Sequence, residues 1–338
     1  MHIVLSSYGA SLRKERDLFK VTTASGQQLL HPRDVDSISV ARGATISSDA
    51  VLLAIAHEID VLFVDRMGKP TGRVWSVKYG SISSIRKAQI EFLYSPAAVE
   101  WVRELVITKL NNQIALLLSY QDRAAEVDAP IVRRAINAIE DHKRKVRGLK
   151  GETVADLAPT LRGWEGAASR RYFEAINAFL PAHWRFERRS THPARDPFNA
   201  MLNYGYGILY GKVEGALIRA GLDPYVGIFH RDDYNRPALV FDVIERFRIW
   251  IDYVVTQLAI FDALPEESFS ISEDGAYRLE GLGKRILIQS VNDYLAEVIP
   301  LSGLARSREI HLRIYAQKLA SFFVEQAGLP ALTIEEEE

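Results

Sequence analysis

The chain contains no cysteine among its 338 residues. Disulfides, thiolate zinc sites and a cysteine nucleophile are therefore excluded, and the absence fits a reducing cytoplasm. Long apolar runs are also missing, since none approaches the ~20 residues that span a bilayer. The apolar run at the N-terminus is too short for a signal peptide. The sequence therefore predicts a cytoplasmic protein with no membrane partner.

The chain also lacks a strong net charge, because its formal total is −1. The charges are unevenly distributed: residues 131–195 contain 14 Lys and Arg against 7 Asp and Glu, and the chain ends in the acidic run Glu335 to Glu338. A basic middle segment suits a local anionic partner. A set of solvated helix faces explains it equally well.

Short β-prone runs separated by turn signals such as Tyr8-Gly9 and Ser25-Gly26 dominate the first part of the sequence. Strands are expected over 2–6, 18–23, 37–41, 60–65 and 72–77, with one short apolar helix over 50–59. From about residue 86 the hydrophobic pattern changes, and long segments follow in which apolar residues recur at helical spacing. Helices are expected over 97–120, 129–145, 164–180, 197–220, 242–263, 277–297 and 307–327.

These patterns predict an α+β fold with a small N-terminal β domain followed by a larger all-α domain. The expected boundaries are 1–78 for the β-rich domain, 79–85 for a small polar linker, 86–330 for the helical domain and 331–338 for an acidic tail. A chain of this length, with 48% hydrophobic residues, is long enough for two domains with a large core.

One candidate site residue is Glu165, which lies among small residues in Gly163-Trp164-Glu165-Gly166, where a helix is expected to start. The small neighbours leave room for another group to approach the carboxylate closely. A glutamate in the first turn of a helix is also favoured by the helix dipole alone. The motif is therefore compatible with a site and with a purely structural role.

The other candidates are His230, at the end of an apolar run, and Asp242 with Glu245, three positions apart. A neutral imidazole is a common ligand of divalent metals, and acidic residues at that spacing share one helix face. A hydrogen-bonded core histidine and a capping box are the structural alternatives. Together with Glu165, these residues offer nitrogen and oxygen donors without a thiolate, which suits Mg²⁺ or Mn²⁺.

The segment between Glu165 and His230 contains several arginines and aromatic residues, within residues 184–206. Arginines bind phosphates and aromatic rings stack on exposed bases. We therefore take Arg188, Arg189 and Arg195 as candidate nucleic-acid contacts, with Tyr204 as a stacking residue. A structural loop in front of a packed helix is the alternative.

Four stretches, in this order and spacing, resemble the CRISPR-associated integrase–endonuclease family, the larger protein of the spacer-acquisition (adaptation) complex. They are residues 163–166 (GWEG), 196–206 (DPFNAMLNYGY), 221–230 (GLDPYVGIFH) and 236–248 (RPALVFDVIERFR). Residues 5–9 and 72–74 also fit, so the resemblance covers nearly the whole chain.

The resemblance implies a metal-dependent DNA endonuclease and strand transferase. Such an enzyme inserts foreign DNA fragments (spacers) into a CRISPR array by attack of a 3′-hydroxyl on a phosphodiester. The family's catalytic metal ligands correspond to Glu165, His230 and Asp242, with Glu245 as an auxiliary acidic residue and Mg²⁺ or Mn²⁺ as the cofactor. The resemblance also implies a homodimer that binds double-stranded fragments, the repeat array and a small partner protein.

The dimer contact is expected in the β domain, because a small sheet becomes more stable when a partner covers one of its edges or faces. Two other functions remain open from the residues alone. A generic metal-dependent nuclease without strand joining would use the same ligands, and a non-catalytic DNA-binding subunit would use the acidic cluster only to cap a helix.

Overall fold

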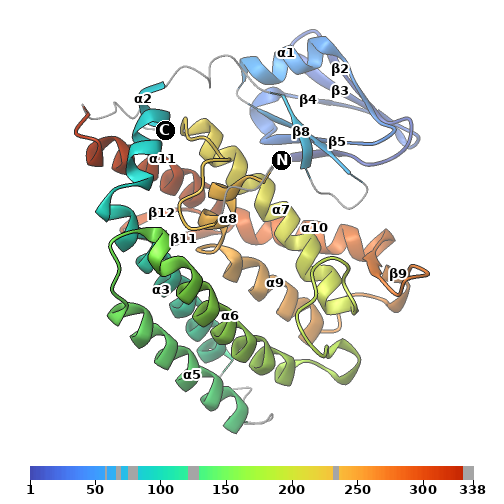
Figure 1. Ribbon diagram of the computed structural model, residues 1–338. Helices are drawn as coiled ribbons and strands as arrows, with labels where there is room; N and C mark the ends of the chain where they lie inside the picture. The colour runs from blue at the N-terminus through green and yellow to red at the C-terminus, as the bar shows by residue number, and fades with distance from the viewer. Residues whose placement is uncertain (58, 66–69, 75–82, 121–128, 231–235, 330–338) are drawn as a thin grey trace. The chain divides into compact units, whose positions relative to one another are not determined.

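The computed structural model describes residues 1–57, 59–65, 70–74, 83–120, 129–230 and 236–329, and its chain forms two compact units, Met1–Ser81 and Ile82–Glu338 (Figure 1). The division falls within the expected linker, residues 79–85, and helix α2 already begins at Ser83. The expected acidic tail, 331–338, lies outside the described residues.

In its described residues, the first unit has two four-stranded sheets and one α-helix. One sheet has the order β1-β5-β7-β8, with β1, β5 and β7 parallel and β8 antiparallel to β7; the other has the order β4-β3-β2-β6. The elements are β1 His2–Leu5, β2 Ser11–Glu15, β3 Leu18–Thr23, β4 Gly26–Leu30, the 3₁₀ turn η1 Pro32–Asp34, β5 Ser37–Ala41, β6 Thr45–Ile46, α1 Ser48–Ala56, β7 Asp60–Val64 and β8 Pro70–Arg73.

A separate apolar core fills this unit, with Leu12, Phe19 and Ile38 fully buried. Sequence periodicity misses β2 and β4, which carry mostly exposed polar side chains. These strands are held by antiparallel backbone pairing to β3 on both of its edges. Backbone hydrogen bonds stabilise a strand whatever its side-chain pattern, so hydropathy alone cannot reveal such strands.

The second unit is mainly helical but is not all-α, which corrects the sequence prediction. Within its described residues, two short antiparallel pairs, β9–β10 and β11–β12, accompany the helices. The elements are α2 Ser83–Leu93, α3 Pro96–Ser119, α5 Ala129–Gly148, α6 Val154–Phe179, η3 Ala182–Trp184, α7 Pro197–Arg219, α8 Ala238–Ile244, α9 Arg248–Ile260, η4 Glu266–Ser268, β9 Phe269–Ile271, β10 Tyr277–Leu279, α10 Gly281–Ala296, β11 Val298–Leu301, β12 Leu304–Ser307 and α11 Arg308–Gln326.

Two helix boundaries differ from the sequence prediction in ways that matter for the site. Helix α6 begins ten residues earlier than expected, because Thr153 and Asp156 form a capping box. Glu165 therefore lies in the middle of α6 and not in its first turn. The expected helix 242–263 is two helices, so Asp242 lies inside α8 and Glu245 ends it. The capping-box interpretation of Asp242 is thereby wrong.

Helix α7 runs through the centre of the helical unit and is buried on nearly all sides (Figure 1). At Gly205 a β-carbon would lie 2.6 Å from Ile251 Cγ2 of α9, so glycine permits the close packing of the two helices. In the described part of the chain, no helix is both long and apolar enough to cross a membrane.

Candidate metal site and nucleic-acid contacts

Three elements of the helical unit bring Lys109, Glu165 and Glu245 together. Lys109 projects from α3, Glu165 from α6, and Glu245 from the turn between α8 and α9. The Lys109 ammonium forms an ion pair with Glu165 Oε1 and a second one with Glu245 Oε2, at 2.5 Å. The three side chains are 14%, 12% and 7% exposed, so two buried carboxylates share one cationic group.

The charges in this group stabilise one another. Burial alone would raise the pKa of Glu245, but the positive charges of Arg248 and Lys109 outweigh it and lower that pKa to about 2. Burial opposes protonation of Lys109, yet the charges of Glu165 and Glu245 raise its pKa above the ordinary value. The Arg248 Nε–H also donates to Glu245 Oε1 at 2.7 Å. Glu245 is therefore ionised and Lys109 protonated at neutral pH.

His230 and Asp242 form the second half of the cluster. Asp242 is fully buried, and its Oδ1 accepts hydrogen bonds from His230 Nδ1, at 2.7 Å, and from the His230 backbone N–H, at 2.8 Å. Its Oδ2 accepts from the backbone N–H groups of Ile228 and Phe229, at 2.7 and 3.1 Å. A carboxylate has about four acceptor positions, so Asp242 is saturated. Donation from Nδ1 leaves the imidazole lone pair on Nε2, the arrangement of a metal-binding histidine.

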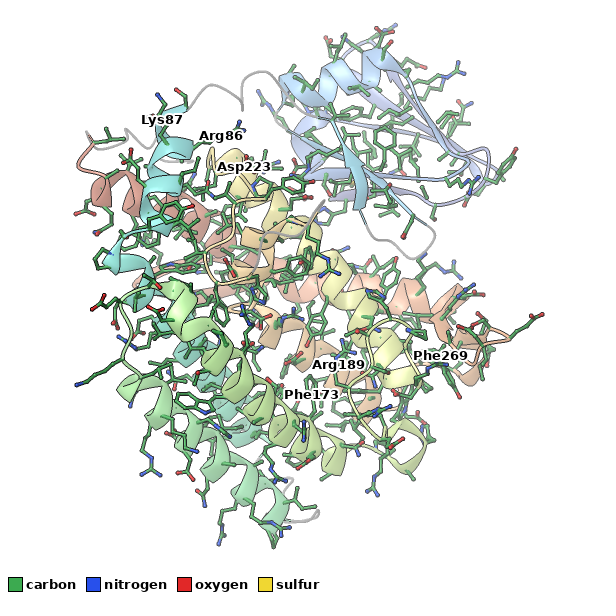
Figure 2. All side chains as sticks on the ribbon, viewed as in Figure 1. Arg86, Lys87, Phe173, Arg189, Asp223 and Phe269 are labelled. Carbon is green, nitrogen blue, oxygen red and sulfur yellow. The ribbon has the colours of Figure 1, made fainter. Side chains whose placement is uncertain are left out.

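The loop that carries His230 is fixed from two further sides. The buried side chain of Gln89 on α2 donates to the carbonyls of Asp223, at 2.8 Å, and Val226, at 2.9 Å, and accepts from the Asp223 N–H. Figure 2 shows Asp223 beside the start of α2. Arg162 of α6 donates to the Phe229 carbonyl at 3.1 Å. The imidazole is therefore held on a rigid loop.

Gly227 makes this loop possible. A β-carbon there would lie 2.5 Å from the Ala238 β-carbon and 2.8 Å from the His230 carbonyl oxygen. Any larger residue would push the loop away from α8 and would move His230 from its position beside Asp242.

The two halves of the cluster are electrostatically coupled. Burial lowers the pKa of His230, but the hydrogen bond and charge of Asp242 and the charges of Glu245 and Glu165 together raise it. As the side chains stand, no three His, Asp and Glu residues in the described ranges are arranged to hold a metal ion. Lys109 lies between the two glutamates, and Asp242 faces the backbone.

The donor chemistry nevertheless fits a divalent cation. Glu165 and Glu245 already share one cationic group, and His230 offers its Nε2 lone pair on a fixed loop. Carboxylate and imidazole donors suit Mg²⁺ or Mn²⁺. Sequence reasoning missed Lys109. The signal that could have identified Lys109 is its place on α3 close to the buried residues Leu110 and Gln113. Lysines are rarely buried unless they are paired with an acidic group.

The Arg189 guanidinium is engaged by groups within the protein. Its Nη1 donates to Asn199 Oδ1 and its Nη2 to Asn203 Oδ1, both at 2.6 Å, and Nη1 also donates to the Ser190 carbonyl. Burial lowers the pKa of Arg189, and its guanidinium lies 5.5 Å from the centre of the Tyr206 ring. Figure 2 shows Arg189 beside α7. The residue fastens the loop before α7 to that helix.

The other candidate contacts differ in accessibility. Arg188 is exposed. Arg195 is exposed but donates to the Asp274 carbonyl. Tyr204 is partly buried, and the Lys284 ammonium lies 5.1 Å from the centre of its ring. Arg188 and Arg195 therefore remain candidate phosphate contacts, and Tyr204 remains a candidate for base stacking.

Curated relatives cover most of the chain. A protein of Archaeoglobus fulgidus described as CRISPR-associated endonuclease Cas1 1 is 28% identical over 95% of this chain and 96% of its own length. A protein of the same description from Pyrobaculum aerophilum is 31% identical over 76% of this chain and 82% of its own length.

Solved structures of the same fold include a CAS1 protein from Thermotoga maritima, with a TM-score of 0.79, 20% identity and 99% of each chain covered. A casposase bound to integration product has a TM-score of 0.81 and 19% identity, covering all of this chain and 94% of the casposase. The model of the family described as CRISPR associated protein Cas1 matches residues 3–293. The chain belongs to the CRISPR-associated Cas1 family.

Proposed function

We propose that this chain is a metal-dependent DNA endonuclease and strand transferase that inserts DNA fragments into a CRISPR array. The observation that carries the proposal is the pair Glu165 and Glu245, which shares a buried cation beside the oriented imidazole of His230. Curated relatives named as endonucleases and a structural neighbour bound to an integration product support the same chemistry.

Glu165, His230 and Glu245 are the residues that would hold Mg²⁺ or Mn²⁺. We assign Glu245 in place of Asp242, because all acceptor positions of Asp242 are taken by backbone N–H groups and the imidazole. An ion bound there would supply charge stabilisation on a phosphate oxygen. Asp242 instead fixes the imidazole, as carboxylates commonly do behind metal-binding histidines.

A buried network behind the site holds Glu245. The Arg248 guanidinium, which binds Glu245, lies 4.7 Å from the centre of the Tyr206 ring. The hydroxyls of Tyr206 and Tyr172 both donate to Asp252, the latter at 2.9 Å. This chain of contacts fixes the carboxylate before DNA arrives, so little reorganisation is needed when a phosphate binds.

Replacement of Arg188 by Ala is expected to weaken DNA binding, because one phosphate contact is lost. The slope of log K against log salt concentration should become less steep by roughly 0.9. Arg189→Ala should leave that salt slope unchanged but destabilise the fold, since Asn199 and Asn203 lose a shared donor. Fluorescence anisotropy at several salt concentrations and urea unfolding separate the two effects. A reduced salt slope for Arg189→Ala with unchanged stability would contradict the assignment.

We also propose a homodimer formed through the first unit, and a small partner protein that binds such dimers. Two structural neighbours are named as Cas6-RT-Cas1–Cas2 complexes. Insertion of a duplex fragment needs two strand transfers, which a two-fold dimer provides simply. Leu29 on β4 and Leu52 on α1 are 50% and 62% exposed, and an apolar partner surface would cover such side chains.

Light scattering should therefore give a mass of twice the 38.1 kDa chain. The double variant Leu29→Glu, Leu52→Glu should shift the protein toward monomer. Leu282→Glu, at a leucine of the second unit that is 51% exposed, is the matched control and should remain dimeric. A monomeric wild-type protein, or dissociation only in the control, would show that the first unit does not form the contact.

The function itself is tested with a supercoiled plasmid and a labelled DNA duplex, with and without the small partner protein. Mn²⁺-dependent nicking and joining of the duplex to the plasmid are expected, and both should be lost in Glu165→Gln. Nicking without joining would indicate a nuclease that does not join strands. Binding without either reaction would indicate a non-catalytic DNA-binding subunit.

A further inference from the structure

The cation that Glu165 and Glu245 share belongs to the protein itself. Both carboxylates contact the Lys109 ammonium, and the three side chains are largely buried, at no more than 14% exposed. Two buried carboxylates this close to one cation would repel each other strongly if that cation were removed, because the charges are poorly screened by water. The metal-free fold therefore depends on Lys109 at this point.

A divalent ion at the same carboxylates cannot coexist with the ammonium in its present position. Two like charges a few ångströms apart in a poorly solvated site repel each other. On the basis of the proposed metal site, we propose that Lys109 is an intramolecular competitor. It occupies the Glu165–Glu245 pair in the metal-free protein, leaves that position when Mg²⁺ or Mn²⁺ binds, and thereby sets the metal affinity.

The surroundings allow the side chain to move while its helix stays in place. On α3, Asn112 donates to the Arg246 carbonyl at 2.8 Å, and Gln113 donates to Ser169 of α6 at 3.2 Å. These bonds tie α3 to the residue after Glu245 and to α6, the helix that carries Glu165. A lysine side chain is a flexible four-carbon stem that can reorient without backbone movement.

The pair is not sealed from solvent, because the Lys109 and Glu165 side chains are 14% and 12% exposed. The displaced ammonium can therefore turn toward solvent, where it remains a positive charge near any phosphate that binds the site.

The proposal predicts that loss of the lysine strengthens metal binding. Isothermal titration of the DNA-free full chain with Mn²⁺ should give a dissociation constant about tenfold lower for Lys109→Met than for wild type, a change of about 1.4 kcal/mol. The thermal midpoint without metal should fall, and its rise on adding Mn²⁺ should be larger than in wild type. A lysine that only supports the fold would give unchanged or weaker Mn²⁺ binding.

Lys212→Met is the matched control. Lys212 is similarly buried and forms an ion pair with Glu309, at 2.9 Å, outside the cluster. This variant should lose stability but keep the wild-type affinity for Mn²⁺. If both variants bind Mn²⁺ as wild type does, Lys109 does not compete with the metal and the proposal is overturned.

A measurement on wild-type protein covers the case in which Lys109→Met does not fold. With ¹³Cε-labelled lysine, the Lys109 signal, assigned through Lys109→Arg, should shift as Mg²⁺ is added, and Glu165→Gln should remove that shift. Mg²⁺ binding that leaves the signal unmoved would overturn the lysine proposal alone. Absence of any Mg²⁺ or Mn²⁺ binding by wild type would overturn the metal site as well.

Discussion

Replacing Glu245 by Gln should reduce Mn²⁺-dependent nicking by about 100-fold or more, because even residues that only support metal ligands typically cost 10- to 100-fold when changed. The amide keeps the size of the side chain but removes the negative charge that faces Lys109 and Arg248. His230→Ala should lose activity to a similar extent while leaving the fold intact, since the imidazole is 30% exposed. Plasmid nicking with and without Mn²⁺ measures both.

Glu309→Gln is the control for a buried glutamate that pairs with lysine away from the cluster. It should keep full nicking activity under conditions in which it remains folded, as circular dichroism would verify. Nicking by Glu245→Gln at the wild-type rate would mean that Glu245 is not a ligand and would return the assignment to Asp242.

The sequence predicted the two-part organisation because its signals are local. Alternating and helical periodicities reflect which face of each element is buried. Strand β2, with Leu12 as its only buried residue, carries no such alternation. The β9–β10 pair is three residues per strand, and periodicity cannot distinguish so short a segment from a helix end. The all-α expectation failed for that reason.

The candidate site was predicted only as a set of residue types. Through the family resemblance the sequence predicted Glu165, His230 and Asp242 as the metal ligands and Glu245 as an auxiliary residue. Our proposal exchanges the roles of the last two. That choice depends on which carboxylate faces the backbone of residues 228–230, a tertiary contact without a local signal. The internal partners of Arg189 could not be predicted for the same reason, because the acceptors on Asn199 and Asn203 meet it only in the folded loop.

Asp242→Asn is expected to damage both stability and metal binding, which tests the supporting role given to this residue. Backbone N–H groups can only donate, and three of them point at the Asp242 carboxylate. An Asn side chain presents one donor –NH₂ to them, so at least one buried N–H loses its acceptor. We expect a loss of about 1–3 kcal/mol in the free energy of unfolding for each buried group left unpaired.

The same substitution should weaken Mn²⁺ binding by roughly 10- to 100-fold, since the His230 ring loses the acceptor that fixes its tautomer. Asp252→Asn is the matched control for stability alone, because Asp252 is also buried but accepts from the hydroxyls of Tyr172 and Tyr206. A hydroxyl can rotate to donate or to accept, so Asn is tolerated there at a smaller cost. Urea unfolding of both variants and Mn²⁺ titration of Asp242→Asn are the measurements. Wild-type Mn²⁺ affinity in Asp242→Asn would show that this carboxylate does not hold His230 for the metal, whereas complete loss of binding, as in Glu245→Gln, would make Asp242 a direct ligand after all.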